Sequence, residues 1–358
     1  MIKLATVFSG IGAPEAALEQ MKVDFEIVFA CDNGERELKD TYDQIMQATK
    51  DLSNEDRIKY VDQLYEKSHK INNVKPSYFA NHNIDESRWF EDVRFIDGEQ
   101  FADQVDILVG GSPCQSFSTY GKKKGFEDTR GTLFFHYADL ISKIKPKVFI
   151  YENVTGLKTH DSGNTWKRIL EVFDELEYTT YVFDLNAKDY GLPQNRERIF
   201  VVGFKKQLGI NDFKAPRKLK LRKTAFDYLS KRVDLKYYMG QKGFEWVTTP
   251  EKHQGRSRVN KDVIGCQTAN QQFNWTGDFY LEEPSEEIKN TKSIYIGTYE
   301  GRECVARKLT PKECLRLMGF KKFKIVVNDK NAYRQSGNSI AVPVMIALFK
   351  SIFKRVKF

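Results

Sequence analysis

The sequence is short of cysteine and histidine, and neither residue type is spaced for a metal. Its five cysteines and five histidines are scattered over 358 residues, and no Cys-x-x-Cys pair occurs. This spacing argues against a structural zinc site, so we expect no metal. An odd, unpatterned set of cysteines is typical of a reducing compartment, where one thiol can be catalytic and the others are buried.

Long hydrophobic runs are missing as well. No stretch approaches the roughly 18 consecutive apolar residues that indicate a membrane span, and the first residues show no cleavage-type signal pattern. Hydrophobic residues make up 41% and charged residues 30% of the chain, which is typical of a globular protein with a sizeable core. We therefore predict a cytoplasmic protein without a membrane partner.

Positive charge is concentrated in one segment. The net charge is +8, yet residues 204–261 contain 16 Lys and Arg against 5 Asp and Glu, a balance of +11. The remainder of the chain is therefore slightly acidic. A basic excess confined to one segment indicates a surface that faces a polyanion. A solvated linker face would explain the charge alone equally well.

Up to about residue 204, short apolar runs alternate with helical patterns. Continuous apolar runs are typical of strands buried on both faces of a parallel sheet. Strands that alternate with helices predict an α/β fold with a doubly wound sheet, whose ligands bind at the carboxyl ends of the strands. The expected strands are residues 4–8, 25–30, 105–109, 148–151, 180–184 and 198–204, and the expected helices are residues 14–21, 133–144 and 165–176.

Two segments interrupt this alternation. Residues 40–75 predict a helical insertion, in which Ser53 caps a helix that contains Val61 and Tyr65 on one face. Residues 205–302 are basic, rich in aromatic and amide side chains, and weakly periodic, so we expect a second, smaller irregular or β-rich domain there. Helical patterns resume at residues 310–318 and 342–356. The predicted domains are thus residues 1–204 with 303–358, and residues 205–302.

The first motif that carries chemistry runs from Phe8 to Glu15 as Phe-Ser-Gly-Ile-Gly-Ala-Pro-Glu. It lies between a predicted strand and a predicted helix, where glycines let a ligand approach the backbone and helix amides attract a carboxylate. Pro14 fits the first helical position. Glu15 stands where a dinucleotide fingerprint needs glycine and would repel a pyrophosphate, which favours a cofactor without phosphates. A plain tight turn remains the simpler interpretation of this motif alone.

The strongest motif is residues 110–118, Gly-Gly-Ser-Pro-Cys-Gln-Ser-Phe-Ser. Cys114 follows a proline at the carboxyl end of a predicted strand, a poor position for core packing and a good one for a nucleophile. Free cysteines are more commonly buried apolar residues, but the flanking glycines and the polar loop favour reactivity here. The loop of residues 118–130 is long enough to close over a substrate.

Charged residues follow the other predicted strands. Glu152, in Glu-Asn-Val, would lie in the same crevice as Cys114, where partial burial would let it act as an acid. Arg196 and Arg198 alternate at a turn that enters a strand and could hold a phosphate or a carbonyl oxygen. Asp32 could bind ribose hydroxyls and Asp92 an adenine amino group. Taken singly, each is equally compatible with a solvated surface residue.

In this order and spacing, the motifs resemble the DNA (cytosine-5) methyltransferase family of bacterial and phage restriction–modification systems. The resemblance covers residues 3–36, 90–204 and 303–356, and it includes the Pro-Cys, Glu-Asn-Val and Gln-x-Arg-x-Arg motifs. It implies a Rossmann-like catalytic domain and a target-recognition domain in the basic segment. The helical insertion at 40–75 is longer than compact members of the family need.

The resemblance also implies roles for individual residues. Cys114 would be the nucleophile, Glu152 the acid and Arg198 the contact to cytosine O2, with Arg196 in support and Asn153 holding a water. The cofactor would be S-adenosylmethionine, bound by Phe8, Ser9, Gly10, Ile11, Gly12, Asp32, Asn33, Asp92, Val93, Pro113, Leu133, Asn338, Ser339 and Ile340. Asn33 stands where an aromatic residue often stacks on the adenine.

The resemblance implies double-stranded DNA as the partner and a cognate restriction endonuclease as a functional companion. It also implies that the enzyme is a monomer. The residues expected at the DNA are Gln115, Ser118, Tyr120, Arg130, Arg256, Arg258, Thr268, Asn270 and Gln271.

Other interpretations remain open. A tRNA cytosine-5 methyltransferase is disfavoured because Ser112, not proline, precedes Pro113, and because no Cys-Phe-Thr occurs. A catalytically silent DNA-binding regulator is disfavoured by intact Cys114, Glu152 and Arg198. A nicotinamide oxidoreductase is disfavoured by Glu15.

Overall fold

The structure, a computed structural model, describes residues 1–113, 133–270 and 272–358. It forms two compact units. The first unit comprises residues 1–185, 197–217 and 345–358, and the second comprises residues 186–196 and 218–344.

The first unit is built on one mixed sheet. In the described residues, seven strands follow the order β3-β2-β1-β4-β5-β7-β6. The pairs β1–β2, β1–β4, β2–β3 and β4–β5 are parallel, whereas β5 and β7 are antiparallel. The strands are β1 (Ile2–Val7), β2 (Phe25–Cys31), β3 (Trp89–Phe90), β4 (Ile107–Gly110), β5 (Val148–Val154), β6 (Tyr178–Asn186) and β7 (Glu197–Lys205).

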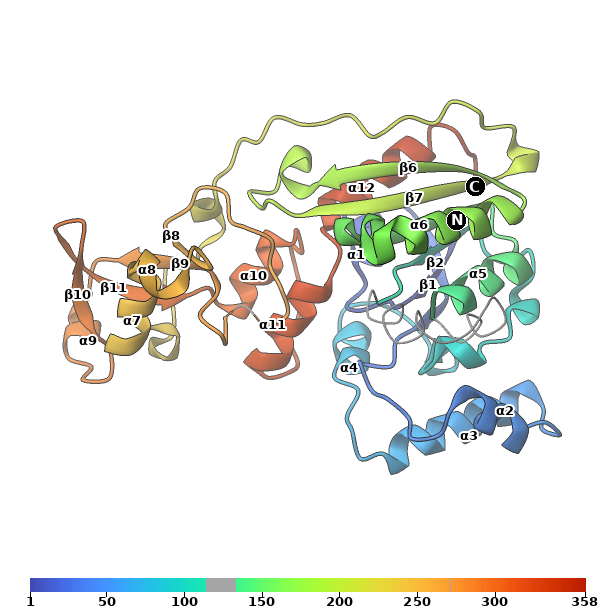
Figure 1. Cartoon of the computed structure of the whole chain (residues 1–358), viewed down its shortest axis with the longest axis horizontal. Helices are drawn as coiled ribbons and strands as arrows, with labels where there is room; N and C mark the ends of the chain where they lie inside the picture. The colour runs from blue at the N-terminus through green and yellow to red at the C-terminus, as the bar shows by residue number, and fades with distance from the viewer. Residues whose placement is uncertain (114–132, 271) are drawn as a thin grey trace. The chain divides into compact units, whose positions relative to one another are not determined.

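Helices connect the parallel strands and cover the sheet. Since β2 and β5 lie on opposite sides of the β1–β4 pair, right-handed crossovers place the β1–β2 helix and the β4–β5 helix on opposite faces. The predicted doubly wound α/β sheet is therefore confirmed. The helices of this unit, shown in Figure 1, are α1 (Ala13–Met21), α2 (Tyr42–Ala48), α3 (Asn54–Lys67), α4 (Val74–Phe79), α5 (Leu133–Ile144), α6 (Asn164–Glu175) and most of α12 (Val342–Ile352).

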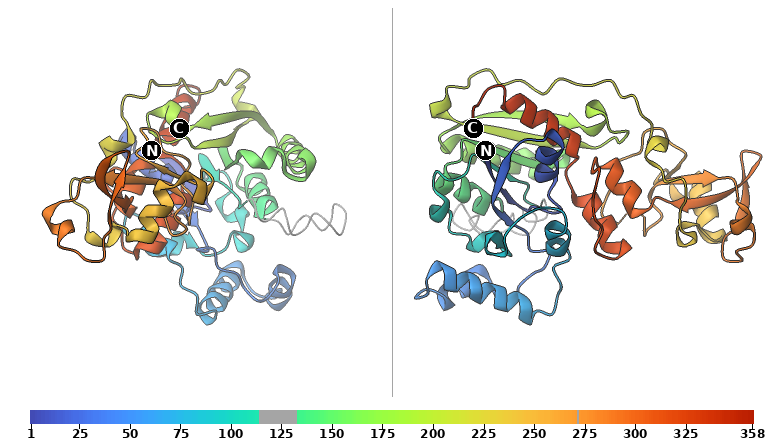
Figure 2. Two further views of the ribbon diagram at one scale, coloured as in Figure 1. Left: turned by 60° about the vertical axis from the view of Figure 1, so that its left-hand side comes forward. Right: turned by 180° about the vertical axis from the view of Figure 1, so that it is seen from behind.

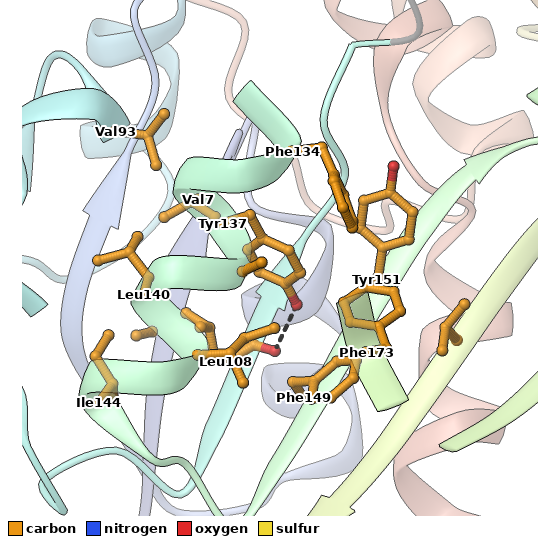
Figure 3. Close-up of a cluster of buried hydrophobic side chains, with 14 of the residues drawn as sticks. Val7, Val93, Leu108, Phe134, Tyr137, Leu140, Ile144, Phe149, Tyr151 and Phe173 are labelled. Atoms are coloured by element: carbon orange, nitrogen blue, oxygen red, sulfur yellow. Dashed lines mark hydrogen bonds between the residues drawn. The ribbon is translucent and has the colours of Figure 1, made fainter. Parts of the chain in front are cut away.

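Aromatic side chains fill the core between the sheet and helices α5 and α6 (Figure 3). Phe134 packs edge-on against both Tyr151 and Phe173, with ring centroids 5.5 and 5.4 Å apart. The buried Tyr137 hydroxyl donates to the Ile150 carbonyl at 3.0 Å, which satisfies a polar group that would otherwise be costly in this core. The core thus fixes the two central strands, β4 and β5, against α5.

Helices α2 and α3 lie within the predicted helical insertion at residues 40–75, and α4 begins at its end. Figure 2 shows α2 and α3 side by side, outside the layers formed by the sheet and its helices. The Ser53 hydroxyl caps α3 by accepting from the Asp56 amide, as expected. Val61 and Tyr65 form the buried face of α3 and pack with Ile45 of α2 and Phe95 of the body.

The second unit contains a small sheet of the order β10-β11-β9-β8 among the described residues. Neighbouring residues of its central strand serve two cores, because side chains alternate along a strand. Phe279 packs with Phe244 of α7, while Tyr280 packs with the helices α10 and α11. The elements are α7 (Gln241–Thr248), α8 (Pro250–His253), β8 (Ser257–Val259), β9 (Gly277–Glu282), α9 (Glu286–Lys289), β10 (Ile296–Tyr299), β11 (Arg302–Lys308), α10 (Pro311–Leu317) and α11 (Asp329–Asn338).

A buried ion pair joins β11 to α10. Arg307 and Glu313 are both fully buried, and the guanidinium donates twice to the carboxylate, at 3.0 and 3.2 Å. The same carboxylate accepts from the amides of Thr310 and Ser230, each at 2.7 Å. Removal of either side chain would therefore leave the other charge buried without its partner, which is strongly destabilising.

The compact units differ from the predicted domains in three places, one of which is residues 205–217, which lie in the first unit and not in the second. Residues 303–344, expected with the first sheet, belong to the second unit because β11 pairs with β9 and β10 there. Residues 186–196 also belong to it, since the Asn195 amide bonds to the Ile264 carbonyl at 2.8 Å. Helix α11 was not predicted, because its polar residues give it little apolar periodicity.

By length and composition, the segment from Asp329 to Phe353 is the one stretch of the described residues that could span a membrane. It is divided into α11 and α12, and 56% of its most apolar window is buried in the protein. Burial of this kind is expected of core helices.

The insertion provides a test of buried charge through Asp62 on α3. Burial, and then repulsion from Glu91, raises the pKa of Asp62 to about 6. Above that pH the ionised carboxylate destabilises the folded state, and the destabilisation is relieved as the pH falls towards the unfolded-state value. We expect Asp62→Asn to raise the melting temperature at pH 8 and to have no effect at pH 4.

Asp56 is the matched control on the same helix. The Ser53 hydroxyl lowers the pKa of Asp56, so its ionised form stabilises the fold, and Asp56→Asn should lower the melting temperature at pH 8. Equal changes in melting temperature for the two variants at pH 8 would contradict the conclusion that ionised Asp62 destabilises the fold.

Candidate active site

The turn between β1 and α1 leaves its backbone open at one point. Gly10 and Gly12 both have left-handed backbone angles, with φ of 53° and 75°. A Cβ on Gly10 would meet no atom within 4 Å, whereas one on Gly12 would lie 2.2 Å from Nε2 of His82. Gly12 is therefore required for packing, and Gly10 exposes the backbone to a ligand.

His82 contacts the backbone of this turn and stabilises it. Its Nε2 lies 3.0 Å from the Ile11 carbonyl and its Nδ1 lies 2.9 Å from the Glu19 carboxylate. Both neighbours are acceptors, so this geometry favours the charged imidazole, in which both ring nitrogens donate. Burial alone would lower the pKa of His82, but these two partners and the nearby Glu15 carboxylate raise it. His82 was not singled out from the sequence, because a lone histidine carries no pattern.

Glu15 does not face the turn's open side. It is fully buried and accepts hydrogen bonds from the Thr6 and Tyr78 hydroxyls at 2.9 and 2.6 Å. The first turn of α1 thus directs the Glu15 side chain into the core, so it does not line the ligand side of the turn as expected. Its predicted repulsion of a phosphate stays a prediction. Ser9 is also structural, since its hydroxyl lies between Thr6 and the backbone of Cys31.

Asp32 stands at the carboxyl end of β2, beside the glycine turn. Its two carboxylate oxygens accept from the amides of Gly10 at 2.9 Å and Gly34 at 2.8 Å. Burial raises the pKa of Asp32, and the two amide bonds partly oppose this effect. Each oxygen has a second lone pair, so the carboxylate can accept two hydroxyl donors. The Asn33 side chain closes the adjoining turn by bonding to Arg36 and Glu35.

Asp92, at the end of β3, is already surrounded by donors. Oδ1 accepts from the backbone amide and Nε of Arg94 at 3.0 and 2.9 Å. Oδ2 accepts from Arg94 Nη2 at 2.6 Å and from the Tyr65 hydroxyl at 2.7 Å. Neither donor was predicted, since Tyr65 lies in the insertion and Arg94 had no motif to mark it. Val93 follows directly and is buried.

The ends of β4 and β5 meet at Gly111. A Cβ there would lie 2.9 Å from the Glu152 carbonyl oxygen and 3.1 Å from its Oε2. Asn153, which is 4% exposed, donates to the Ser112 carbonyl at 2.9 Å and to the Tyr151 hydroxyl at 2.8 Å. One bond of the Asn153 amide group thus positions the segment that leads to Pro113, and the other lies within β5. We therefore do not assign it the water predicted from the sequence.

Glu152 and Arg198 form the charged pair of this edge. Nε of Arg198 lies 3.3 Å from Oε1 of Glu152, and the side chains are 16% and 14% exposed. The antiparallel register of β5 and β7 pairs Val154 with Arg198, which brings the two side chains to the same face. The resemblance puts Glu152 and Arg198 at the same cytosine, and the two side chains lie next to each other at this edge. The crevice that Glu152 is predicted to share with Cys114 stays a prediction, because Cys114 lies outside the described residues.

Several predicted residues lie outside the described part of the chain. They are Cys114, Gln115, Ser118, Tyr120, Arg130 and Gln271. The two residues that flank the first gap are described: Pro113 is exposed, and Leu133 is partly buried against the core.

Arg196 does not join Arg198 at the pair. It belongs to the second unit, is 3% exposed, and donates to the carbonyls of Gln267, Gly337 and Ser339 at 2.8, 3.0 and 2.7 Å. Of the two predicted alternatives for this arginine, a phosphate or a carbonyl oxygen, the structure shows carbonyl oxygens, which belong to two backbone segments. Asn338, Ser339 and Ile340 follow in this unit, so their place in a cofactor pocket stays a prediction.

The predicted DNA-reading residues differ in their surroundings. Arg258 donates to both oxygens of buried Asp278, at 3.0 and 2.8 Å, and so braces β8 against β9. Arg256, Thr268 and Asn270 are exposed. A Cβ on Gly337 would lie 2.4 Å from the Thr268 backbone, so this exposed segment rests directly on α11.

Comparisons with known proteins identify relatives across most of the chain. A profile described as C-5 cytosine-specific DNA methylase matches residues 63–354. The type II methyltransferase M1.ScrFI of Lactococcus lactis subsp. cremoris is 41% identical over 74% of this chain, and the match spans 66% of that protein. M.HpaII of Haemophilus parainfluenzae is 40% identical over 71% of this chain, and the match spans 73% of that protein.

Solved structures extend the likeness to the whole chain. A DNMT2 variant from Spodoptera frugiperda has a TM-score of 0.66 at 18% identity and covers 99% of this chain and 100% of its own. Dnmt2 methyltransferase from S. pombe gives a TM-score of 0.64 at 16% identity, with full coverage of both chains. At these identities the likeness shows the fold.

The contact between Gly111 and Glu152 yields a stability prediction. Gly111→Ala should push the Glu152 backbone away from β4 and cost about 1–3 kcal/mol of folding free energy, as overpacking does. Chemical denaturation measures this loss. Gly156→Ala is the control, because a Cβ there meets nothing within 4 Å, and equal losses in the two variants would refute the close approach.

Proposed function

Because the chain belongs to the C-5 cytosine-specific DNA methylase family, we propose that it methylates carbon 5 of a cytosine in duplex DNA. The observation that carries the proposal is the ion pair between Glu152 and Arg198. Glu152 contacts Gly111, and Gly111 lies on the segment that leads to Pro113 and Cys114. A carboxyl group and a guanidinium at this position suit a ring that must be hydrogen-bonded at N3, the amine and O2.

The proposed cofactor is S-adenosylmethionine, which when bound supplies the methyl group that cytosine accepts. The edge formed by β1 and β2 fits its chemistry. Asp32 has two acceptor positions for two ribose hydroxyls, and the backbone at Gly10 is open to a ligand. The start of α1 favours a carboxylate, as helix N-termini do. Phe8, Ile11, Val93 and Leu133 are the proposed apolar contacts.

Cys114 is the proposed nucleophile. Cytosine C5 is too weak a nucleophile by itself, so the thiolate first forms a bond to C6. The electron pair of the C5–C6 double bond then forms a C4–C5 double bond, and the C4–N3 pair moves onto N3, so that C5 becomes an enamine-like nucleophile. Glu152 protonates or hydrogen-bonds N3, and Arg198 stabilises charge at O2. After methylation, C5 loses its proton to a base and the sulfur–C6 bond breaks, which restores the double bond and releases Cys114.

This chemistry requires a base outside the helix stack. Flipping costs a few kcal/mol, and the basic surface of the second unit offsets it through phosphate contacts. Exposed Arg256, Thr268 and Asn270 are the proposed contacts in this unit. Binding should therefore weaken steeply with salt. We place the enzyme in the cytoplasm as a monomer and alongside a cognate restriction endonuclease, in keeping with the type II naming of M1.ScrFI and M.HpaII.

Covalent trapping tests the proposal. Bisulfite sequencing of DNA from cells that express the protein first identifies the methylated site. A duplex that carries 5-fluorocytosine at that site cannot lose its C5 substituent as a proton, so the cysteine adduct should persist. We expect a denaturation-resistant complex with the wild type and the cofactor, and at least a hundredfold less complex with Cys114→Ser, consistent with loss of a nucleophile.

Cys304→Ser is the matched control, because Cys304 is a buried residue of β11, and it should trap as well as the wild type. Trapping that persists in Cys114→Ser would refute the nucleophile. Methyl incorporation into tRNA but not into duplex DNA would refute the substrate.

A further inference from the structure

We propose that the helical insertion at residues 40–75 forms part of the methyl-donor site, where Tyr65 positions Asp92 for the adenine ring. The inference rests on the proposed function, since it takes the edge around Asp32 and Asp92 as the place where S-adenosylmethionine binds. From the sequence, the insertion is expected to have no chemistry of its own. Its contacts with the body indicate otherwise.

Tyr65 is the point at which α3 reaches that edge. Its side chain is 1% exposed, and its hydroxyl donates to Oδ2 of Asp92 at 2.7 Å. The Arg36 guanidinium lies over the ring, 4.4 Å from its centroid. Burial and the Asp92 carboxylate raise the pKa of Tyr65, so the hydroxyl keeps its proton and remains a donor. The bond is charge-assisted, a class stronger than ordinary hydrogen bonds.

Both ends of the insertion are fastened to the same strand end. Arg36, before α2, and Asn72, after α3, both donate to the Glu91 carboxylate, which immediately precedes Asp92. Asn72 also donates to the Asp32 carbonyl at 2.8 Å. Asn72 therefore contacts the backbone of Asp32 and the side chain of Glu91, the residue before Asp92. Asp32 and Asp92 are the two carboxylates proposed to bind the methyl donor. These contacts leave little freedom for α3 to move relative to Asp92.

The hydrogen-bond donors around Asp92 differ in how readily a ligand can displace them. The Arg94 amide and side chain and the Tyr65 hydroxyl together fill the roughly four acceptor positions of a carboxylate. An adenine amino group must therefore replace one of them. The Arg94 side chain is 20% exposed, whereas Tyr65 is almost wholly buried. Arg94 is thus the donor that yields, and Tyr65 is the one that keeps Asp92 oriented when adenine binds.

Packing does not explain the Tyr65 hydroxyl. The cluster around its ring is apolar and contains Ile45, Val61 and Phe95. A phenylalanine would fill the same space, and it would not bury a polar group that needs a partner. The hydroxyl is therefore best explained by its bond to Asp92. In this role Tyr65 is a positioning residue, because it acts on the donor through the carboxylate.

The test compares Tyr65→Phe with Tyr60→Phe, which removes a hydroxyl from the same helix and the same apolar cluster. Binding of S-adenosylhomocysteine and of S-inosylhomocysteine is measured by titration calorimetry. The second ligand has a carbonyl oxygen in place of the adenine amino group. The wild type and Tyr60→Phe should prefer the amino ligand, and Tyr65→Phe should lose about tenfold of that preference, the usual scale of a hydrogen bond to a charged group. At saturating donor, kcat should be unchanged in both variants, while KM for the donor rises only in Tyr65→Phe.

The outcomes separate the two proposals. A wild type that binds neither ligand, or does not discriminate between them, overturns the donor site itself. A wild type that discriminates, together with a Tyr65→Phe variant that retains the same preference, overturns the role of Tyr65 alone. A lower melting temperature without a change in preference also overturns it, because a purely structural tyrosine would behave in that way.

Discussion

The parallel pairing of β1 with β2 and β4, and of β4 with β5, is the constraint on which the candidate site depends. Parallel strands end at one edge, so residues that are far apart in the chain become neighbours there. The Gly10 amide meets Asp32 across 22 positions of sequence, and Asn153 holds the Ser112 carbonyl across 41. One antiparallel strand then adds Arg198 to Glu152. The two subsites that we propose, one for a nucleoside and one for a reacting ring, both lie on this edge.

Buried charge is the second theme of the molecule. His82 bonds to a carbonyl and a carboxylate, Asp92 is surrounded by donors, and Arg307 lies against Glu313. Such groups are tolerated because each finds hydrogen-bonding partners, and removal of one partner would strand the other. Two of these clusters adjoin the glycine turn and the strand end at Asp92. Electrostatic cost is thus accepted where a ligand is proposed to be held in a fixed geometry.

The insertion illustrates how an addition to a fold can acquire a role. Its helices have a small apolar cluster, yet buried polar contacts of the insertion and of Arg36 just before it converge on Glu91, Asp92 and Asp32. An element that only added bulk would not need buried polar bonds at that edge. In the second unit, one buried side chain likewise joins two segments. Arg196 donates to three carbonyls, one in the segment after Cys266 and two at the end of α11.

The sequence by itself determined the doubly wound sheet, the helical insertion and the motif residues, since apolar periodicity and short glycine, Pro-Cys and Glu-Asn-Val motifs are local signals. The tertiary structure decided what local signals do not contain. It turned Glu15 into the core, committed Asn153 and Arg196 to backbone carbonyls, and placed residues 303–344 in the second unit. It also brought Tyr65 to Asp92. The physical reason is that a hydrogen-bond partner distant in sequence is chosen by packing, which no spacing of residues along the chain encodes.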